Sequence, residues 1–461
     1  MRIGVARVPI TPAAGIVHLR GFASRHRPAQ SVHDALLATA LVLADDHGPR
    51  ACLVSCDLCA LSPGDSARIE ARVGALVGVP AAAVWIACSH THSGPAVTLP
   101  AEGAAAGEAG PAQGAGPPVG PGEAGGDGPS GGQGRYSAWL VDQIAGCAFL
   151  AAHDLRPAAL GAAWGQAQLG VNRRERRGDG RIVLGENPSG PVDHRTTLLR
   201  VEEAGGRPLA AVLHHACHPV VLGPDSYALS ADYVGFARAA AESALGVPVL
   251  FVQGACGNIN PTPRGNFAVA ERLGQILGAE AIRLWSLACA EPLAEVRTAA
   301  RTFDVPLGPL PDLAEAEQEV LRRSAHLAAQ AGLGRAGEIA AARMYLGWAT
   351  SRLRAVGAGR TAASAPVLLR AMRCNGVGLV GAPFEPFVET GVAVRDASPH
   401  QPLLFCGYTG GVLTYVPVAE AYPEGGYEVD DAFRHFGLPA PPLPEAEGRL
   451  RTAFAEMLAA L

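Results

Sequence analysis

Cys88-Ser89-His90-Thr91-His92-Ser93-Gly94-Pro95 directly follows an apolar run, Ala83-Val84-Trp85-Ile86-Ala87, that predicts a buried strand. A strand that ends in His-x-His would place both imidazoles on one face, because side chains alternate along a strand. The Ser-Gly-Pro that follows predicts a turn. Two imidazoles at the end of a strand can bind a metal ion or polarise a substrate. One solvated and one core histidine explains the same stretch equally well, so the rest of the chain has to decide.

The length and charge of the chain predict a globular protein that neither binds nucleic acid nor spans a membrane. Its 461 residues allow a large core, in one big domain or two to three ordinary ones. The net charge is −5 and both signs are spread along the chain. There is no basic stripe for nucleic acid and no polybasic helix for an anionic membrane. The longest uncharged run, 73–101, is broken by glycines, prolines and the two histidines, so no membrane span is predicted.

The cysteines and the N-terminus predict a cytoplasmic protein. Ten cysteines are scattered without a framework spacing, mostly in apolar runs, as expected for reduced, buried thiols. Cys56-Asp57-Leu58-Cys59 matches CxxC, but no second CxxC exists, so a redox or zinc role there is not expected. Residues 1–8 predict a first strand and lack the continuous apolar segment of a signal peptide.

Strands alternate with helices along the chain, which predicts an α/β fold with a mixed β-sheet flanked by helices. The predicted strands cover 2–8, 38–44, 51–56, 209–215, 248–252 and 403–408, with two short strands in 368–380. The predicted helices cover 62–76, 136–155, 232–245, 267–287 and 444–460. Ser230 is the expected N-cap of the third helix, and Glu385-Pro386 is expected to open a further one.

Two segments interrupt this alternation within a single expected domain, 1–461. Residues 101–134 hold 13 glycines and 5 prolines among 34 residues and no aromatic residue, which predicts a mobile insertion beside the histidine turn. Residues 311–358 predict a helical hairpin that is broken near two glycines.

Further polar groups also follow predicted strands. His214-His215-Ala216-Cys217-His218-Pro219 is a second histidine cluster, Glu385 lies at a strand-to-helix junction, and Tyr415 and Tyr427 lie near the C-terminus. The basic run 169–177 is, taken alone, more typical of a solvated face. None of these spacings is a short-range zinc pattern such as HExxH, so the residues alone support only a candidate metal site.

Motifs spread over nearly the whole chain occur in the order found in one family. They are Gly21-Phe22-Ala23-Ser24, Val32-His33-Asp34, Ser89 to Pro95, Asn172-Arg173, Ala216 to Gly223 with Ser230-Ala231-Asp232-Tyr233, Gln253 to Pro261, Glu385-Pro386-Phe387, and Tyr415-Val416-Pro417 to Gly426-Tyr427-Glu428. In these motifs the chain resembles the catalytic domain of the neutral/alkaline, non-lysosomal ceramidases, which are zinc-dependent amidases.

The resemblance implies a fold like the ceramidase catalytic domain and a zinc site. The implied zinc ligands are His90, His218, Glu385 and Tyr415, and the implied substrate-facing residues are His92, Arg173 and Tyr427. Imidazoles and a carboxylate suit zinc. Zinc lowers the pKa of a bound water, which would then attack the amide carbonyl. The three substrate-facing residues are expected to hold the developing oxyanion or to protonate the leaving nitrogen.

The chain departs from the larger family members in two ways. Their Gly-Asp-x-Ser-Pro turn is Gly257-Asn258-Ile259-Asn260-Pro261 here, which removes one acidic group and a serine that could act as nucleophile. Asn260 therefore favours the metal route, while Asn258 raises the question of altered activity. The larger members also carry a C-terminal immunoglobulin-like domain, whereas this chain ends in a predicted helix. A smaller or more soluble N-acyl compound is therefore expected as the substrate in place of ceramide.

Three functional hypotheses follow. The first is a zinc-dependent hydrolase of a linear amide, acting on a small-molecule N-acyl substrate in lipid metabolism. The second is a catalytically degenerate relative that binds an acylated ligand without turnover, motivated by the two asparagines. The third is a zinc esterase or lactonase that uses the same site.

Overall fold

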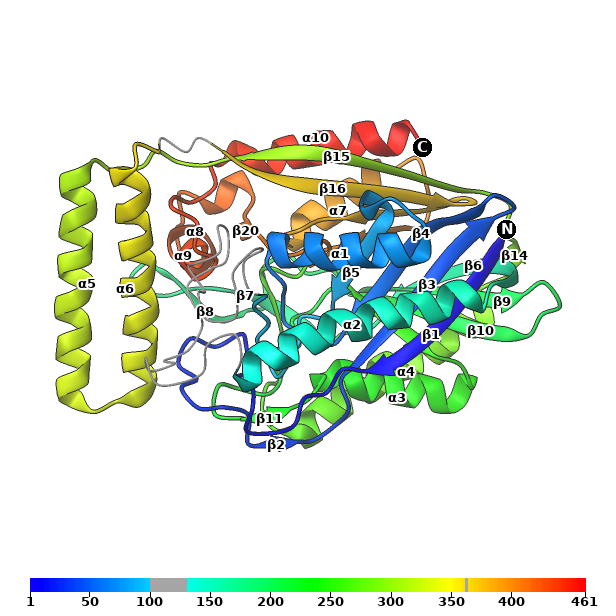
Figure 1. The fold of residues 1–461 in the computed structure, drawn as a ribbon, viewed down its shortest axis with the longest axis horizontal. Helices are drawn as coiled ribbons and strands as arrows, with labels where there is room; N and C mark the ends of the chain where they lie inside the picture. Colours follow the sequence, from blue (N-terminus) through cyan, green and yellow to red (C-terminus); the bar gives the residue numbers. More distant parts are fainter. Residues whose placement is uncertain (100–130, 361–363) are drawn as a thin grey trace.

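The computed structural model describes residues 1–99, 131–360 and 364–461. The insertion predicted over 101–134 lies outside the described residues as far as residue 130, and its predicted end is wrong, because residues 132–134 already belong to the helix α2 (Gly132–His153). The described chain forms four layers, helices on sheet on sheet on helices (Figure 1). This arrangement confirms the predicted α/β class with mixed sheets and flanking helices.

The larger sheet has nine strands. Its order is β12 (Val249–Gln253), β10 (Pro208–His215), β9 (Arg195–Glu203), β6 (Arg156–Gln166), β1 (Arg2–Pro9), β3 (Leu37–Asp45), β4 (Gly48–Cys56) and β5 (Val84–Cys88), and β14 (Glu291–Pro292) pairs with β6. β10 with β12 and β4 with β5 are parallel, whereas the other neighbours are antiparallel.

The sequence analysis missed β6 and β9. β6 is rich in alanine and glycine, which have low strand propensity, so pairing within the sheet decides its structure.

The second sheet has four strands in the order β15 (Val296–Pro306), β16 (Ser364–Cys374), β17 (Val377–Gly381) and β19 (Leu403–Cys406). β17 and β19 are parallel. Of the two short strands predicted in 368–380, β16 is longer than predicted, because it pairs along its whole length with β15.

The alternation of side chains divides the core between the layers. In β5, Ile86 and Cys88 pack with the helices, whereas Trp85 and Ala87 pack with Met372 on the second sheet. The helices on the outer face of the larger sheet are α1 (Pro63–Val77), α2 (Gly132–His153), α3 (Asp232–Leu245) and α4 (Phe267–Leu287). α7 (Val388–Ala397) and α10 (Glu445–Ala459) cover the far face of the second sheet, and α10 lies along β15 in Figure 1.

α5 (Leu313–Leu333) and α6 (Ala336–Gly357) pack as an antiparallel pair at one end of the molecule (Figure 1). They lie within the span where the sequence predicts a helical hairpin. The assignment of the whole chain to a single domain stays a prediction.

Short elements complete the fold around the ends of the strands. β7 (Gly170–Arg176) pairs with β8 (Ile182–Asn187) and β13 (Ile259–Pro261), β18 (Glu385–Pro386) pairs with β20 (Tyr415–Val416), and β2 (Ser31–Val32) pairs with β11 (Ala228–Leu229). The remaining short elements are α8 (Tyr427–Asp430), α9 (Ala432–His435), η1 (Ala81–Ala83) and η2 (Ala419–Ala421).

Two predicted helix starts are wrong. Ala231, not Ser230, occupies the N-cap of α3, although the Ser230 hydroxyl accepts a hydrogen bond from the Asp232 amide at 3.0 Å. Glu385 and Pro386 do not open a helix, because they pair as a strand with Tyr415 and Val416, and α7 begins only at Val388.

All ten cysteines are free thiols, and nine of them are buried. Among the described helices, none has both the length and the apolarity that a membrane span requires.

Candidate metal centre and active site

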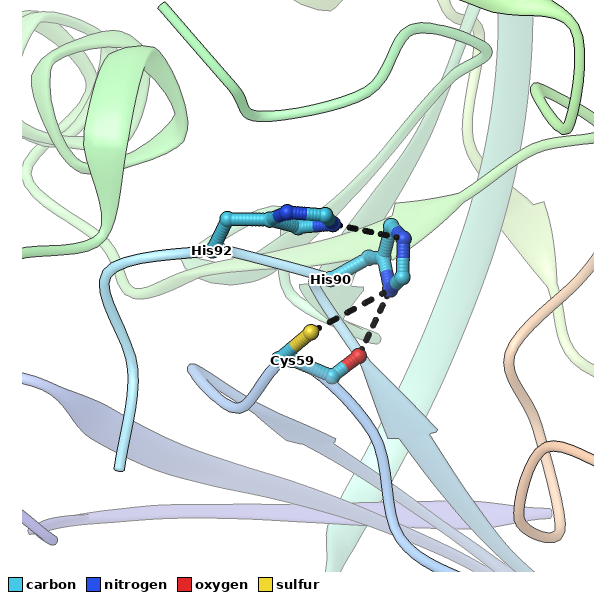
Figure 2. Close-up of side chains that lie close together, drawn as sticks. All are labelled: Cys59, His90 and His92. Atoms are coloured by element: carbon cyan, nitrogen blue, oxygen red, sulfur yellow. Dashed lines mark hydrogen bonds between the residues drawn. The ribbon is translucent and has the colours of Figure 1, made fainter. Parts of the chain in front are cut away.

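The two histidines after β5 lie on a turn, not on the strand. β5 ends at Cys88, and His90 has a φ of 68°, a left-handed conformation that is uncommon outside glycine. The prediction that strand alternation puts both rings on one face is therefore wrong. The turn nevertheless brings them together, because His90 Nε2 lies 3.2 Å from His92 Nε2 (Figure 2).

Backbone carbonyls determine which ring nitrogens of the histidines are free. His90 Nδ1 lies 2.7 Å from the Cys59 carbonyl oxygen (Figure 2), and His218 Nδ1 lies 2.7 Å from that of Cys256. A carbonyl can only accept, so each Nδ1 carries a proton and donates it. Nε2 is then the ring nitrogen whose lone pair could bind a cation, as in histidine ligands that are oriented by a second hydrogen bond.

Both Nε2 atoms converge on one carboxylate oxygen. Glu385 Oε2 lies 3.3 Å from His90 Nε2 and 3.2 Å from His218 Nε2. The three side chains are at most 4% exposed. Burial alone would raise the pKa of Glu385, but the facing His90 and His218 hold it well below its usual range. The carboxyl group is therefore ionised.

The histidines respond differently to this carboxylate. Burial lowers the pKa of His90, but Glu385 outweighs burial and raises it to about 10. Burial and the charge of Arg173 lower the pKa of His218 to about 4. A proton on His90 and a divalent cation would satisfy the same carboxylate, so the two compete for this position.

The donor set fits a divalent cation such as zinc. Two imidazole nitrogens and one carboxylate oxygen are typical zinc ligands. A second group, Cys59 with His90 and His92, also lies close together. Its thiol is 3.9 Å from His90 Nδ1, but that nitrogen already donates to the Cys59 carbonyl. The group formed by His90, His218 and Glu385 is therefore the better candidate metal site.

The predicted tyrosines and arginine lie next to this group. Tyr415 pairs with Glu385 in the short β18–β20 sheet, and its hydroxyl accepts a hydrogen bond from Arg173 Nη2 at 3.0 Å. Arg173 Nη1 lies 3.3 Å from His218 Nε2 and 3.4 Å from Asn260 Oδ1. The Tyr427 ring lies 5.7 Å from that of Tyr415 and 5.9 Å from the Arg173 guanidinium carbon. The structure thus brings all seven predicted site residues together, and their roles stay predictions.

His92 is held in the neutral form. Burial lowers its pKa well below the usual range, and the neighbouring His90 and His218 lower it further. Its ring packs edge-on against Phe22, and its backbone carbonyl accepts a hydrogen bond from Arg25. Its Nδ1 has no hydrogen-bond partner among the described residues.

Sequence reasoning missed Tyr408, which contacts two of the candidate ligands. Its hydroxyl donates to Glu385 Oε2 at 3.3 Å, and its ring packs at a tilt against that of His90 with centroids 4.1 Å apart. Tyr408 has a φ of 55°, so both Tyr408 and His90 hold a backbone conformation that is costly away from glycine. No sequence pattern indicates such a contact.

Asn258 lies beside the site, but both polar atoms of its side chain hydrogen-bond other residues of the protein. Its Oδ1 accepts a hydrogen bond from the Val388 amide at the start of α7, and its Nδ2 donates to Glu389 at 2.8 Å. Both polar atoms of the amide are therefore paired within the protein.

A second polar network lies behind Tyr427. The Tyr345 hydroxyl of α6 donates to Asp431, and His435, whose ring packs 5.6 Å from that of Tyr427, also faces this carboxylate. Burial raises the pKa of Asp431, but the facing His435 and the hydrogen bond from Tyr345 hold it at about 2.

The fold and the site together define an α/β protein with a preformed group of two histidines and one glutamate that can hold a cation. No protein-family model matches the sequence, and no curated protein matches it either. The whole chain superimposes on 74% of neutral ceramidase from Pseudomonas aeruginosa, with a TM-score of 0.70 and 18% identity. It likewise covers 75% of a ceramidase solved in complex with C2, with a TM-score of 0.72 and 19% identity. The resemblance to neutral ceramidases is thus confirmed for the fold over the whole chain.

Proposed function

We propose that this protein is a zinc-dependent hydrolase that cleaves the amide bond of a linear N-acyl compound. The observation that carries the proposal is the convergence of His90 Nε2 and His218 Nε2 on Glu385 Oε2, next to Arg173. The shared fold with neutral ceramidase supports the reaction class.

His90, His218, Glu385 and Tyr415 would hold the metal. When bound, a zinc ion supplies Lewis-acid chemistry that polarises a carbonyl and lowers the pKa of a water molecule. The Nδ1 hydrogen bonds of both histidines keep their rings oriented for this role.

Three side chains would assist the reaction. The Arg173 guanidinium and the Tyr427 hydroxyl would donate hydrogen bonds to the amide oxygen as it gains negative charge. Neutral His92 would carry a proton on Nε2 from the attacking water to the leaving nitrogen. In this reaction the water oxygen bonds to the acyl carbon, the C–N bond breaks, and the nitrogen leaves with the transferred proton.

The substrate is proposed as a small or soluble N-acyl compound, and ceramide is included in the test because both structural neighbours are named as ceramidases. A cytoplasmic location also remains a proposal. It is supported by the ten free thiols, most of which are buried.

Metal analysis combined with a substrate panel tests the proposal. We expect about one zinc per chain, and hydrolysis of N-acyl amides that EDTA abolishes and zinc restores. Folded, metal-free protein that does not take up zinc would overturn the proposal. Matched amide, ester and lactone substrates separate an amidase from an esterase or lactonase. Binding of the N-acyl compound to zinc-loaded protein without turnover would instead show the degenerate relative.

A further inference from the structure

Two consecutive arginines of β7 reach the same carboxylate. Neighbouring residues on a regular strand point to opposite faces. Here the register between β7 and β8 shifts between Asn172 and Arg174, which marks an irregularity of the β-bulge type. The Arg174 amide donates to Asn172 Oδ1 at 3.0 Å, and the Arg173 amide donates to the Asn258 carbonyl at 2.8 Å. Bulges redirect side chains, so both guanidinium groups can meet at Glu428.

Glu428 uses both of its oxygens in this contact. Oε1 accepts from Arg173 Nε at 2.8 Å, and Oε2 accepts from Arg174 Nη1 at 2.9 Å. The Glu428 side chain is fully buried, and the two arginine side chains are 6% and 7% exposed. Arg174 is anchored further by the Gly425 carbonyl at 2.8 Å and by Glu424 at 3.3 Å. The carboxylate is therefore fixed on one side by an arginine that is itself tied to the backbone.

The orientation of Arg173 follows from this anchor. Because Glu428 holds Nε, the two terminal nitrogens face the candidate site, Nη1 towards His218 and Nη2 towards Tyr415. Glu428 is also the residue next to Tyr427 at the start of α8. One buried carboxylate thus links the placement of both proposed oxyanion donors.

We propose that Glu428, braced by Arg174, is a positioning residue that aims Arg173 at the reacting carbonyl. The inference rests on the proposed function, because it assigns Glu428 a part in the same reaction. Glu428 contacts none of the candidate metal ligands through a hydrogen bond or ion pair among the described residues, so its loss should leave metal binding intact.

A double-mutant cycle between E428Q and R173M tests the proposal. Misplacing a reacting group by about 1 Å can cost about 100-fold in rate. We therefore expect E428Q to lower kcat about 10- to 100-fold, with zinc content unchanged. In the R173M background, E428Q should lower kcat by less than about threefold, since the group it positions is gone. Losses that multiply in the double variant would overturn the proposal, as would a kcat in E428Q equal to that of the wild type.

The control is E447Q, which changes another buried glutamate that pairs with Arg451 on α10. It should alter stability without altering kcat. If E428Q does not fold, R174M takes its place in the cycle, because it keeps the bond between Arg173 and Glu428 and removes only the brace. R174M should then lower kcat about three- to tenfold, again only when Arg173 is present.

A crystal structure separates failure of this inference from failure of the proposed function. If the wild-type protein hydrolyses no N-acyl substrate, the proposed amidase function is refuted. The double-mutant cycle then has no kcat to compare. In that case, a shift of the Arg173 guanidinium in E428Q, with His90, His218 and Glu385 unmoved, supports the positioning role. An unmoved Arg173 overturns it whatever the activity.

Discussion

Replacing Tyr408 with phenylalanine removes one hydroxyl from the candidate metal centre and leaves its ring against His90. The lost group is a donor to Glu385 Oε2, the oxygen that both histidines face. Loss of such an outer partner typically weakens metal binding about 10- to 100-fold. The bond is 3.3 Å long, beyond the usual range for O–H···O, so the lower end applies. We expect zinc affinity to fall about tenfold, or about 1.4 kcal/mol.

Competition with a chelator of known affinity measures this change. The matched control is Y422F, which removes a hydroxyl that donates to the Pro442 carbonyl at 3.0 Å, in a contact that includes no candidate metal ligand. Y422F should leave zinc affinity unchanged. Two results would contradict this reasoning: Y408F binds zinc as tightly as the wild type, or Y408F and Y422F lose affinity equally. Either result would mean that the Tyr408 hydroxyl does not support Glu385 as a metal ligand.

Three further predictions concern the histidine turn, a buried ion pair and acid stability. H90A should lose zinc, whereas H92A should keep zinc and lose turnover, as metal analysis and kinetics will show. E70Q should lower the free energy of unfolding by about 3–5 kcal/mol in urea titrations, because Arg370 would stay buried without its carboxylate partner. D431N should be less stable than the wild type at neutral pH. Because the folded pKa of Asp431 is about 2, below the unfolded value, this deficit should shrink as the pH falls from about 4 towards 2.

Each of these predictions has an outcome that would contradict it. Equal zinc loss in H90A and H92A would show that both histidines are ligands. E456Q breaks an exposed pair with Arg301 and should cost less than about 1 kcal/mol, so an equal cost in E70Q would contradict the burial argument. A stability deficit of D431N that stays constant down to about pH 2 would contradict the depressed pKa.

The sequence allowed the class of the fold and the membership of the site to be predicted, but not the geometry. Taken alone, the residues supported only a candidate metal site, and the set of His90, His218 and Glu385 came from the resemblance to neutral ceramidases. The local conformation was not recognisable. The His-x-His argument assumed a continuing strand, whereas β5 stops at Cys88 and the backbone turns left-handed at His90.

Contacts between segments far apart in the sequence could not be predicted either. The basic run 169–177 looked like a solvated face, yet the side chains of Arg173 and Arg174 are only 6% and 7% exposed. Their burial depends on Glu428, about 250 residues further along the chain, and on a strand irregularity that has no signature in sequence. Tyr408 was missed for the same reason. The segment that follows β19 pairs with the end of β5 and with the residue before β18, and this pairing places Tyr408 beside the candidate ligands.

The structure weakens the hypothesis of a catalytically degenerate relative, which rested on Asn258 and Asn260. Asn258 uses its oxygen on the first turn of α7 and its nitrogen on Glu389, so the residue stabilises the segment that follows Glu385. An aspartate there would place a second carboxylate against Glu389, where the asparagine Nδ2 now donates at 2.8 Å, and two carboxylates this close avoid repulsion only by taking up a proton. The asparagine is thus matched to its neighbour in this chain. Asn260 contacts Arg173, which the proposed reaction uses. Neither substitution removes a group that a metal-activated water would need, so neither argues against catalysis.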